Sequence, residues 1–524
     1  MLNHIANSVL STNQMRGARL PSEVPSNAPK VTVVVPVYGD LDSLVLCVRA
    51  LIETIDESRH EVLLVNDCGP EADAIEAALL ELIADQPLFR YERNDQNLGF
   101  VGTCNRAAME LDRSDNDILL LNSDTEPRPG FLEELQAVLY ADEHHGVVCA
   151  RSNNATIASL PYRITGRGTS RSVERTETVF NELSDALPRW SVSPVAMGFC
   201  FLVRRTLITR FGLFDDFFAP GYGEENDFCL RVDQAGYRAV IANRALVIHE
   251  GSKSFVGERR NALRDAHQKK LEARYPYYGR AIRAFMRFGT EALERFADAF
   301  VPGSDRLTFG IDIRGLSALA SDTAQHRSVI DQVRALALGL SSDSDVEVFA
   351  DSADLAALRL NPARIRQSLE VTSDEVLHVG LMLVGGIDAS KLAIANRRYA
   401  FWAGWSLEGP VTSWDKRVSR LGLDIAGEYL RRFATATFEG AAAPSPDDLR
   451  RVLADQHQLP RDRRRTRLED RWAAFRLVDS VPSASSATDA RVRKLESDLD
   501  ALRDSLSYRI GSRAVGAAKR IVRR

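Results

Sequence analysis

The residues best placed to do chemistry follow an apolar run near the middle of the N-terminal half. The run Asp117–Leu121 shows no alternation of polar and apolar residues, and Asn122, Ser123 and Asp124 come directly after it. An unalternated run of this length is typical of a strand buried on both faces of a parallel sheet. Polar residues after such a strand lie where open α/β sheets bind their ligands. An isolated aspartate there often only forms a turn, but this one has polar neighbours, so we expect a ligand site.

Three carboxylates within four residues form a second signal. Glu224, Glu225 and Asp227 follow the glycines of Gly221–Gly223. Carboxylates at this spacing repel one another unless a metal ion, a substrate or a cation compensates them. The glycines let backbone and substrate approach closely, which favours a chemical role for the two glutamates. A structural explanation is equally acceptable for Asp227, because an acidic residue in the first turn of a helix complements the helix dipole.

A divalent cation is expected beside Asp124. The sequence contains neither a GxGxxG nor a GxxxxGK[ST] pattern, so no glycine-rich phosphate cradle is indicated. The charge of a diphosphate must then be met in another way, and Mg²⁺ or Mn²⁺ on a carboxylate would meet it. His249 follows the apolar run Ala245–Ile248. A lone histidine there is more often structural, but near a site that calls for a divalent ion we expect it to be a ligand.

Alternating strands and helices are predicted to position these residues. Apolar runs end at Tyr38, Asn66, Arg93 and Leu121, and residues with helical spacing lie between them. The alternation predicts an α/β fold with a doubly wound sheet. Because crossovers between parallel strands are right-handed, the ends of these strands should share one edge of the sheet. A carboxylate after the second strand, here Asp67, commonly bonds the ribose or base of a nucleotide.

From Val31 to about Phe255 the chain resembles a family 2 glycosyltransferase with the GT-A fold. The similarity is carried by segments that occur in the family's order: VVVPVYGD, VNDC, NLGFVGTCNRA, LLLNSDTEP, GLFDDFF, GYGEENDFCLR and HEGSKSF. The resemblance implies a GT-A-type mixed sheet and an inverting transfer of sugar from a nucleotide-sugar to an acceptor hydroxyl. Within the family it is similar to enzymes of bacterial surface polysaccharides, O-antigen included.

The resemblance also implies a role for each site residue. Asp124 would fill the metal position of a DXD-type motif, with His249 as a further metal or diphosphate contact, while Asn122 departs from the motif's first aspartate. Glu225 stands where the family's aspartate base stands, and we choose it as the base; Glu224 would bind acceptor hydroxyls. The remaining nucleotide-sugar contacts would be Pro36, Tyr38, Asp67, Asn97, Gly99, Asn105, Asn122, Ser123 and Asp227.

A second, smaller α/β domain is predicted beyond Pro302. Apolar runs at 307–313 and 346–350 flank residues with helical spacing, which predicts a Rossmann-like βαβ unit. This stretch faintly resembles the N-terminal half of a family 4 glycosyltransferase with the GT-B fold. The expected division is a leader or linker at 1–29, the GT-A domain at 30–300, the smaller domain at 305–440, a linker and basic segment at 441–488, and a short heptad helix with a basic amphipathic tail at 489–524.

Composition limits the partners and the location. The net charge of -5 argues against nucleic acid as the partner of the whole chain, and no apolar run reaches the length of a membrane span. Six cysteines without a CxxC pair are typical of reduced thiols in the cytoplasm. The tail Ser507–Arg524 carries six basic residues and no acidic one, which favours an interfacial helix on an anionic membrane over a solvated end. Heptad spacing before it suggests a homodimer.

We therefore expect a metal-dependent inverting glycosyltransferase, cytoplasmic and peripheral at the inner face of the cell membrane. Its acceptor would be a glycan or a lipid-linked glycan of a surface polysaccharide. The alternative is a non-catalytic nucleotide-sugar-binding subunit of a polysaccharide assembly complex, indicated by Asn122 and Glu225 in place of the family's aspartates. A nucleotidyltransferase is disfavoured because the sequence has no phosphate-binding glycine and lysine loop.

Overall fold

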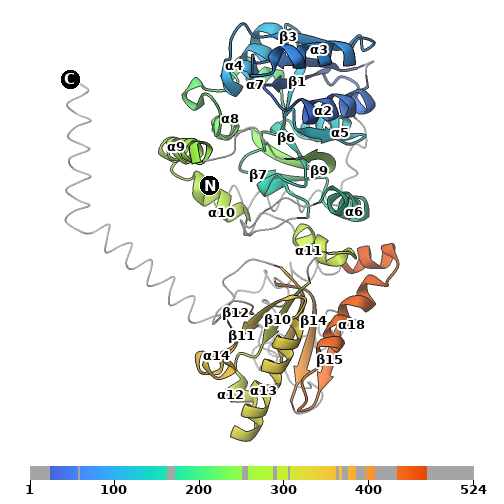
Figure 1. The fold of residues 1–524 in the computed structure, drawn as a ribbon, viewed down its shortest axis with the longest axis vertical. Helices are drawn as coiled ribbons and strands as arrows, with labels where there is room; N and C mark the ends of the chain where they lie inside the picture. The colour runs from blue at the N-terminus through green and yellow to red at the C-terminus, as the bar shows by residue number, and fades with distance from the viewer. Residues whose placement is uncertain are drawn as a thin grey trace, which may run out of the picture.

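Two β-sheets organise the chain, one above the other in Figure 1. The computed structural model describes residues 24–56, 59–161, 172–250, 258–286, 292–304, 307–361, 365–368, 376–384, 395, 398–407 and 434–468. The heptad helix and basic tail predicted for 489–524, and most of the leader predicted for 1–29, lie outside these residues. Within the described part of the chain, every helix is too short or too polar to cross a membrane.

The first sheet is mixed, with strand order β3-β2-β1-β4-β8-β6-β9-β5 and β7 beside β9. Strands β1 to β4 are parallel, whereas β8 runs antiparallel to both β4 and β6. The bounds are β1 (Val31–Val37), β2 (Glu61–Asn66), β3 (Phe89–Arg93), β4 (Asp117–Leu121), β5 (Thr125–Pro127), β6 (His145–Arg151), β7 (Trp190–Ser193), β8 (Cys200–Val203) and β9 (Arg238–His249). The predicted α/β class is confirmed, and the mixed sheet is consistent with the GT-A fold.

Amphipathic helices cover this sheet. Helix α2 buries Leu44, Val48 and Leu51 against it, and Asp40 caps the helix by accepting a hydrogen bond from the Ser43 amide at 3.3 Å. The other helices of this part are α3 (Ala72–Leu82), α4 (Gly99–Arg106), α5 (Phe131–Leu139), α6 (Val173–Leu183), α7 (Arg205–Phe211), α8 (Glu224–Asp233), α9 (Glu258–Arg274) and α10 (Tyr278–Ala284), after α2 (Leu41–Thr54). Helices α2, α3 and α4 follow β1, β2 and β3, so the ends of these strands meet at one edge, as predicted.

The second sheet is parallel throughout, with strand order β12-β11-β10-β13-β14-β15. Its strands are β10 (Thr308–Asp312), β11 (Asp345–Phe349), β12 (Ile365–Ser368), β13 (Leu377–Leu383), β14 (Tyr399–Ser406) and β15 (Ala436–Glu439). The helices around it are α11 (Ala292–Phe300), α12 (Leu316–Leu319), α13 (Thr323–Leu340), α14 (Ser352–Leu358) and α18 (Pro446–His457). The βαβ unit predicted beyond Pro302 is therefore present as β10, α13 and β11.

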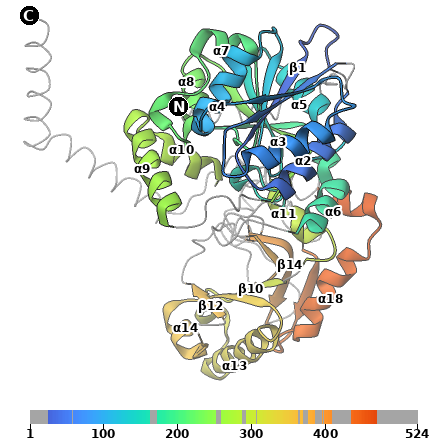
Figure 2. The same cartoon turned by 45° about the horizontal axis from the view of Figure 1, so that its top comes forward.

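Helix α6 lies between the two sheets, next to α11 (Figures 1 and 2). Its residues Val179 and Leu183 belong to the apolar cluster of the second sheet, together with residues of α11 and α18. Arg175 of α6 pairs with Asp298 of α11 at 3.0 Å, and Glu182 pairs with Arg464 at 2.6 Å. Helix α18 lies in the stretch predicted as a linker. The structure differs there because α18 buries apolar residues at helical spacing, namely Leu449, Val452 and Leu453.

Candidate active site

Asp67 stands at the edge formed by the ends of the parallel strands. It follows β2, and its amide donates to the Val37 carbonyl oxygen at 2.7 Å, which fixes it beside the end of β1. Its Oδ1 accepts hydrogen bonds from Asn94 Nδ2 at 2.8 Å and from the Leu98 amide at 2.7 Å. Both bonds use the same oxygen, so the turn before α4 orients the carboxylate, and Oδ2 makes no hydrogen bond to other described residues.

The neighbouring strand end brings Tyr38 and Gly69 into contact. A Cβ atom on Gly69 would lie 1.7 Å from the Tyr38 carbonyl oxygen, so only glycine fits this position. Pro36 pairs with Val65 within the sheet, and the Tyr38 side chain is exposed at the strand end. The predicted donor contacts Pro36, Tyr38 and Asp67 therefore lie together, and Gly69, which sequence reasoning missed, sets their spacing.

The turn before α4 extends this edge toward α8. Asn97 Oδ1 accepts a hydrogen bond from the Gly99 amide at 2.9 Å, and Gly99 has a φ of +73°, which favours glycine. A Cβ on Gly99 would lie 2.9 Å from Pro220 Cβ, so the turn touches the loop that leads into α8. The predicted contacts Asn97 and Gly99 thus lie between Asp67 and the glutamates.

Asp124 and His249 face each other beside β4. His249 Nε2 lies 3.4 Å from Asp124 Oδ1, because antiparallel pairing of β5 with β9 sets Thr125 opposite His249. His249 Nδ1 lies 2.9 Å from the Asn154 carbonyl oxygen, which can only accept, so Nδ1 carries the hydrogen. The His249 amide donates to Asn153 Oδ1 at 2.9 Å. Nε2 is therefore the ring nitrogen that faces the carboxylate.

This pair fits a divalent cation. Asp124 Oδ2 is buried and has no hydrogen-bond partner among the described residues, and an imidazole nitrogen facing a carboxylate oxygen is a donor set that Mn²⁺ accepts. The described residues contain no group of three or more histidine, cysteine, aspartate or glutamate side chains that would complete a site. Asn122 contributes backbone here: its carbonyl oxygen accepts from Thr125 Oγ1 at 2.7 Å, which shapes the turn containing Ser123.

Glu224 and Glu225 occupy the first turn of α8. Gly223, at a φ of +99°, directly precedes the helix as its N-cap residue. Glu224 is 5% exposed, and its Oε2 has no hydrogen-bond partner among the described residues. Glu225 is half-buried, and its Oε1 accepts from Asn226 Nδ2 at 3.0 Å. Burial raises the pKa of Glu224, and the neighbouring charge of Glu225 raises it further; burial also raises the pKa of Glu225. Carboxyl groups with a raised pKa are suited to proton transfer near neutral pH.

Two residues just before β8 lie between the Asp124 and His249 pair and the glutamates of α8. The Phe199 ring stacks on the His249 ring with centroids 5.3 Å apart, and the Phe199 carbonyl oxygen accepts from the Asn122 amide at 2.9 Å. A Cβ on Gly198 would lie 3.3 Å from Glu225 Cγ. Gly198 and Phe199 thus place Glu225 beside the Asp124 and His249 pair. The sequence analysis did not identify Gly198 and Phe199 as site residues. The glycine directly before a predicted strand is the signal that could have identified them.

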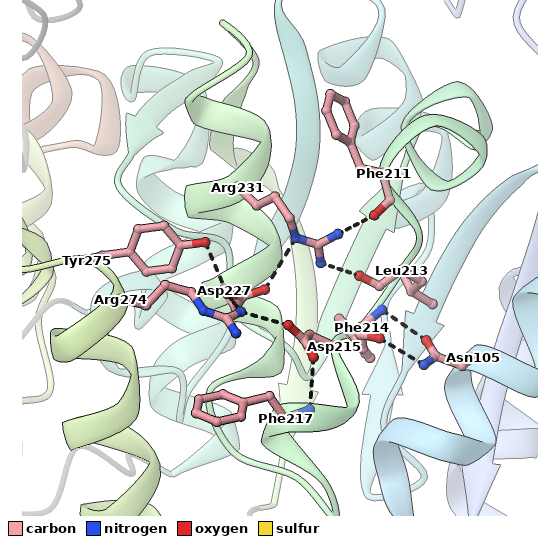
Figure 3. A network of polar contacts seen from close by, with 10 residues as sticks. All are labelled: Asn105, Phe211, Leu213, Phe214, Asp215, Phe217, Asp227, Arg231, Arg274 and Tyr275. Carbon is pink, nitrogen blue, oxygen red and sulfur yellow. Dashed lines mark hydrogen bonds and ion pairs between the residues drawn. The ribbon is translucent and has the colours of Figure 1, made fainter. Parts of the chain in front are cut away.

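Asn105 and Asp227 are held by protein groups (Figure 3). Asn105 donates to the Phe214 carbonyl oxygen and accepts from the Phe214 amide, both at 2.9 Å. Asp227 is fully buried; Oδ1 accepts from Arg274 Nη1 at 2.7 Å and Tyr275 Oη at 3.1 Å, and Oδ2 accepts from Arg231 Nε at 3.3 Å. Both side chains therefore hold neighbouring parts of the protein, and the predicted donor contacts at Asn105 and Asp227 stay predictions.

Comparison with known proteins points to one chemistry. Residues 32–211 match the family model described as Glycosyl transferase family 2, which supports glycosyl transfer as the function of this part of the chain. The match includes Asp67 and Asp124 and ends before α8. Among curated proteins, none matches the chain.

Two solved structures are similar at low identity. A crystal structure of GalNAc-T7 with UDP, GalNAc and Mn²⁺ is 14% identical, with a TM-score of 0.36; the aligned part covers 48% of this chain and 52% of that one, so the chain spans about half of its length. The mannosyltransferase PcManGT from Pyrobaculum calidifontis in complex with GDP-Man and Mn²⁺ is 16% identical, with a TM-score of 0.38, covering 64% of this chain and 89% of that one. Both TM-scores are below 0.5, so neither likeness bears on function.

Proposed function

We propose that the protein is an inverting glycosyltransferase that moves a sugar from a nucleotide-sugar donor to a hydroxyl group of a glycan or lipid-linked glycan. The observation that carries the proposal is the junction at Gly198 and Phe199. On one side of it lie Asp124 and His249, which fit a cation, and on the other lies Glu225. The family match over residues 32–211 supports the same reaction class.

The donor is bound at the edge where the parallel strands end. Tyr38 is exposed there for contact with a base, and Asp67 keeps Oδ2 for a hydroxyl or ring nitrogen while Oδ1 is held by Asn94 and Leu98. Asp124 and His249 would hold the divalent ion, and the ion would supply positive charge that neutralises the leaving diphosphate. His249 stays oriented for this task because the Asn154 carbonyl oxygen fixes its Nδ1 hydrogen.

Glu225 acts as the general base. Its carboxylate takes the proton from the acceptor hydroxyl as that oxygen attacks the anomeric carbon, so the reaction needs no covalent intermediate and the configuration inverts. Glu224 is more deeply buried, and its raised pKa keeps it protonated over a wider pH range. A protonated Glu224 donates a hydrogen bond to an acceptor hydroxyl and does not compete with Glu225 for the proton.

The acceptor is proposed to belong to a bacterial surface polysaccharide of the O-antigen kind, assembled at the inner face of the cell membrane. Support comes from the sequence alone: the resemblance of Val31–Phe255, and the tail Ser507–Arg524 with its six basic residues and no acidic one. A basic tail of this kind is attracted to anionic lipid, which would keep the enzyme near a lipid-linked acceptor. Heptad spacing before the tail supports a homodimer.

A donor hydrolysis screen tests the proposal. Purified protein is incubated with Mn²⁺ and UDP-, dTDP- or GDP-sugars, and release of the nucleoside diphosphate is measured. We expect one nucleotide class to be hydrolysed by the wild type and not by Glu225→Gln. Asp112→Asn is the matched control, since Asp112 is a buried carboxylate that pairs with Arg205 at 2.6 Å and precedes β4, whereas Asp124 follows it.

The same screen decides the alternative function. A non-catalytic nucleotide-sugar-binding subunit is favoured by one observation: the Asp124 and His249 pair has no further acidic side chain among the described residues to complete it. Such a subunit would bind a nucleoside diphosphate with Mn²⁺ in a calorimeter and hydrolyse none of the donors. Binding without turnover would therefore overturn the proposed enzyme.

A further inference from the structure

Asp227 closes the first turn of the helix that carries the proposed base. Its backbone amide donates to the Gly223 carbonyl oxygen at 2.9 Å, which is the hydrogen bond that spans Glu224 and Glu225. Its side chain is fully buried, and both carboxylate oxygens accept hydrogen bonds from protein donors. A residue so placed controls the geometry of the first turn through backbone and side chain together, and it has no exposed oxygen to offer a ligand.

The side chain of Asp227 fastens α9 onto α8 (Figure 3). Arg274, the last residue of α9, donates from Nη1 to Asp227 at 2.7 Å and to Asp215 Oδ2 at 2.8 Å. Tyr275 adds a hydroxyl at 3.1 Å. The two carboxylates and the guanidinium join the loop after α7, the base helix and the end of α9 in one charged contact.

Arg231, one turn after Asp227 in α8, extends the contact. Its Nε donates to Asp227 Oδ2, and its other nitrogens donate to the carbonyl oxygens of Phe211 and Leu213. Next to Leu213, the Phe214 backbone is held by Asn105 of α4. The loop that precedes α8 is thereby bonded both to α4 and to α8 itself.

A second contact shows that α9 clamps the start of α8. His267 of α9 is buried, and its Nδ1 lies 2.9 Å from the Gly221 carbonyl oxygen and 3.0 Å from that of Tyr222. Both carbonyls belong to the loop immediately before Glu224. Helix α9 therefore contacts the loop before the glutamates through His267, and it contacts Asp227, two residues after Glu225, through Arg274.

We propose that Asp227 is a positioning residue for Glu225, acting through its contact with Arg274 to hold the first turn of α8 at the distance that proton transfer needs. The inference rests on the proposed function. Glu225 packs against the backbone at Gly198, because its Cγ lies 3.3 Å from where a Cβ on Gly198 would be. A displacement of the base by 1 Å costs on the order of 100-fold in rate.

The test compares Asp227→Asn with Asp112→Asn. Both changes are isosteric, and both remove a buried charge that faces an arginine. Donor hydrolysis gives kcat and its pH profile, calorimetry with UDP and GDP plus Mn²⁺ gives nucleotide affinity, and hydrogen exchange reports on the amides of α8.

We expect Asp227→Asn to lower kcat by about 10- to 100-fold and to move the pH profile of kcat. Nucleotide affinity should stay unchanged, and hydrogen exchange at the start of α8 should become faster. Asp112→Asn should lose thermal stability without these effects.

A second variant keeps the test decisive if Asp227→Asn folds poorly. Arg274 is partly exposed, so Arg274→Gln should fold and should lower kcat in the same direction, and the double variant should be no worse than Asp227→Asn alone because the two residues share one contact. Wild-type kcat with slow exchange at α8 in both single variants would overturn the inference, as would a loss limited to nucleotide affinity. If the wild type hydrolyses no donor, the proposed function fails, and the exchange comparison still decides whether Asp227 anchors α8.

Discussion

His249 Nε2 faces Asp124 Oδ1 across 3.4 Å, while the opposite ring nitrogen is held by the Asn154 carbonyl oxygen at 2.9 Å. With its hydrogen on Nδ1, the ring has no hydrogen to donate to the carboxylate. Two acceptors then oppose each other unless a cation lies between them or the ring takes a second proton. A divalent ion between the two atoms would satisfy both, and phosphate and water would fill its remaining coordination positions.

Removing the carboxylate of this pair should remove the dependence on metal. Asp124→Ala is expected to abolish turnover and to eliminate the effect of added Mn²⁺ on binding of UDP or GDP. His249→Ala should weaken that effect by roughly 10- to 100-fold, because diphosphate and water refill one position. Calorimetry of each nucleotide with and without Mn²⁺ measures both changes. Full turnover of the wild type in EDTA would contradict the metal assignment.

The two glutamates should differ in which kinetic constant they change. Glu225→Gln keeps the shape and loses the basicity, so kcat should fall by about 10²- to 10⁴-fold while donor affinity survives. Glu224→Gln should mainly raise KM for the acceptor. Steady-state kinetics with a competent acceptor, or donor hydrolysis for the effect on kcat, separates them. The roles must be exchanged if Glu224→Gln removes kcat and Glu225→Gln does not.

Burial of Glu224 predicts a dependence of stability on pH. Its pKa is raised above the ordinary 4.5 by burial and by the charge of Glu225, so the folded state keeps a proton that the unfolded state releases. The stabilising contribution is complete below about pH 4.5 and is lost as the pH rises through the folded-state pKa. Glu224→Gln should therefore raise Tm at pH 7 to 8, and the gain should shrink toward pH 4.5.

Thermal unfolding across this pH range measures the effect, and each unit by which the pKa is raised corresponds to about 1.4 kcal/mol. Glu53→Gln, on the exposed face of α2, is the control that should show no such trend. A gain in Tm that is independent of pH would mean that packing, and not ionisation of Glu224, is responsible.

Gly69→Ala tests the contact between the first two strand ends. A Cβ at this position meets the Tyr38 carbonyl oxygen at 1.7 Å, so one backbone must move. We expect a loss of stability of about 1–3 kcal/mol, as for other overpacked sites, together with weaker nucleotide binding, because Tyr38 and Asp67 would separate. Gly39→Ala is a fair comparison, since a Cβ there meets no atom within 4 Å. Equal behaviour of the two variants would exclude this contact as a determinant of binding.

Truncation after Leu506 tests the proposed membrane contact. The shortened protein should keep its fold and its donor hydrolysis but lose binding to vesicles that contain phosphatidylglycerol. Each basic residue near such a surface contributes about 1 kcal/mol, and the contribution falls with salt. Vesicle flotation at low and high salt measures it, with phosphatidylcholine vesicles as the uncharged control. Binding that persists after truncation, or that ignores salt, would rule out the tail as the anchor.

Local patterns in the sequence were enough to predict the strands and the residues after them. Asp67 and Asp124 follow unalternated apolar runs, and the order of parallel strands places both at one edge. The role of Gly198 and Phe199 could not be found this way, because it depends on antiparallel pairing between β4 and β8, which are far apart in the sequence. Asp227 was ambiguous for a related reason: the partner that satisfies it, Arg274, comes from a helix 47 residues later.

The packing of α6 has a consequence for how the chain can be divided. Val179 and Leu183 pack in the apolar cluster of the second sheet, although they come earlier in the sequence than α8 and the glutamates. A protein ending at Ser304 would present this apolar face to water and would be prone to aggregate. The first sheet and its helices therefore cannot be joined to a different second domain unless the apolar face of α6 is redesigned.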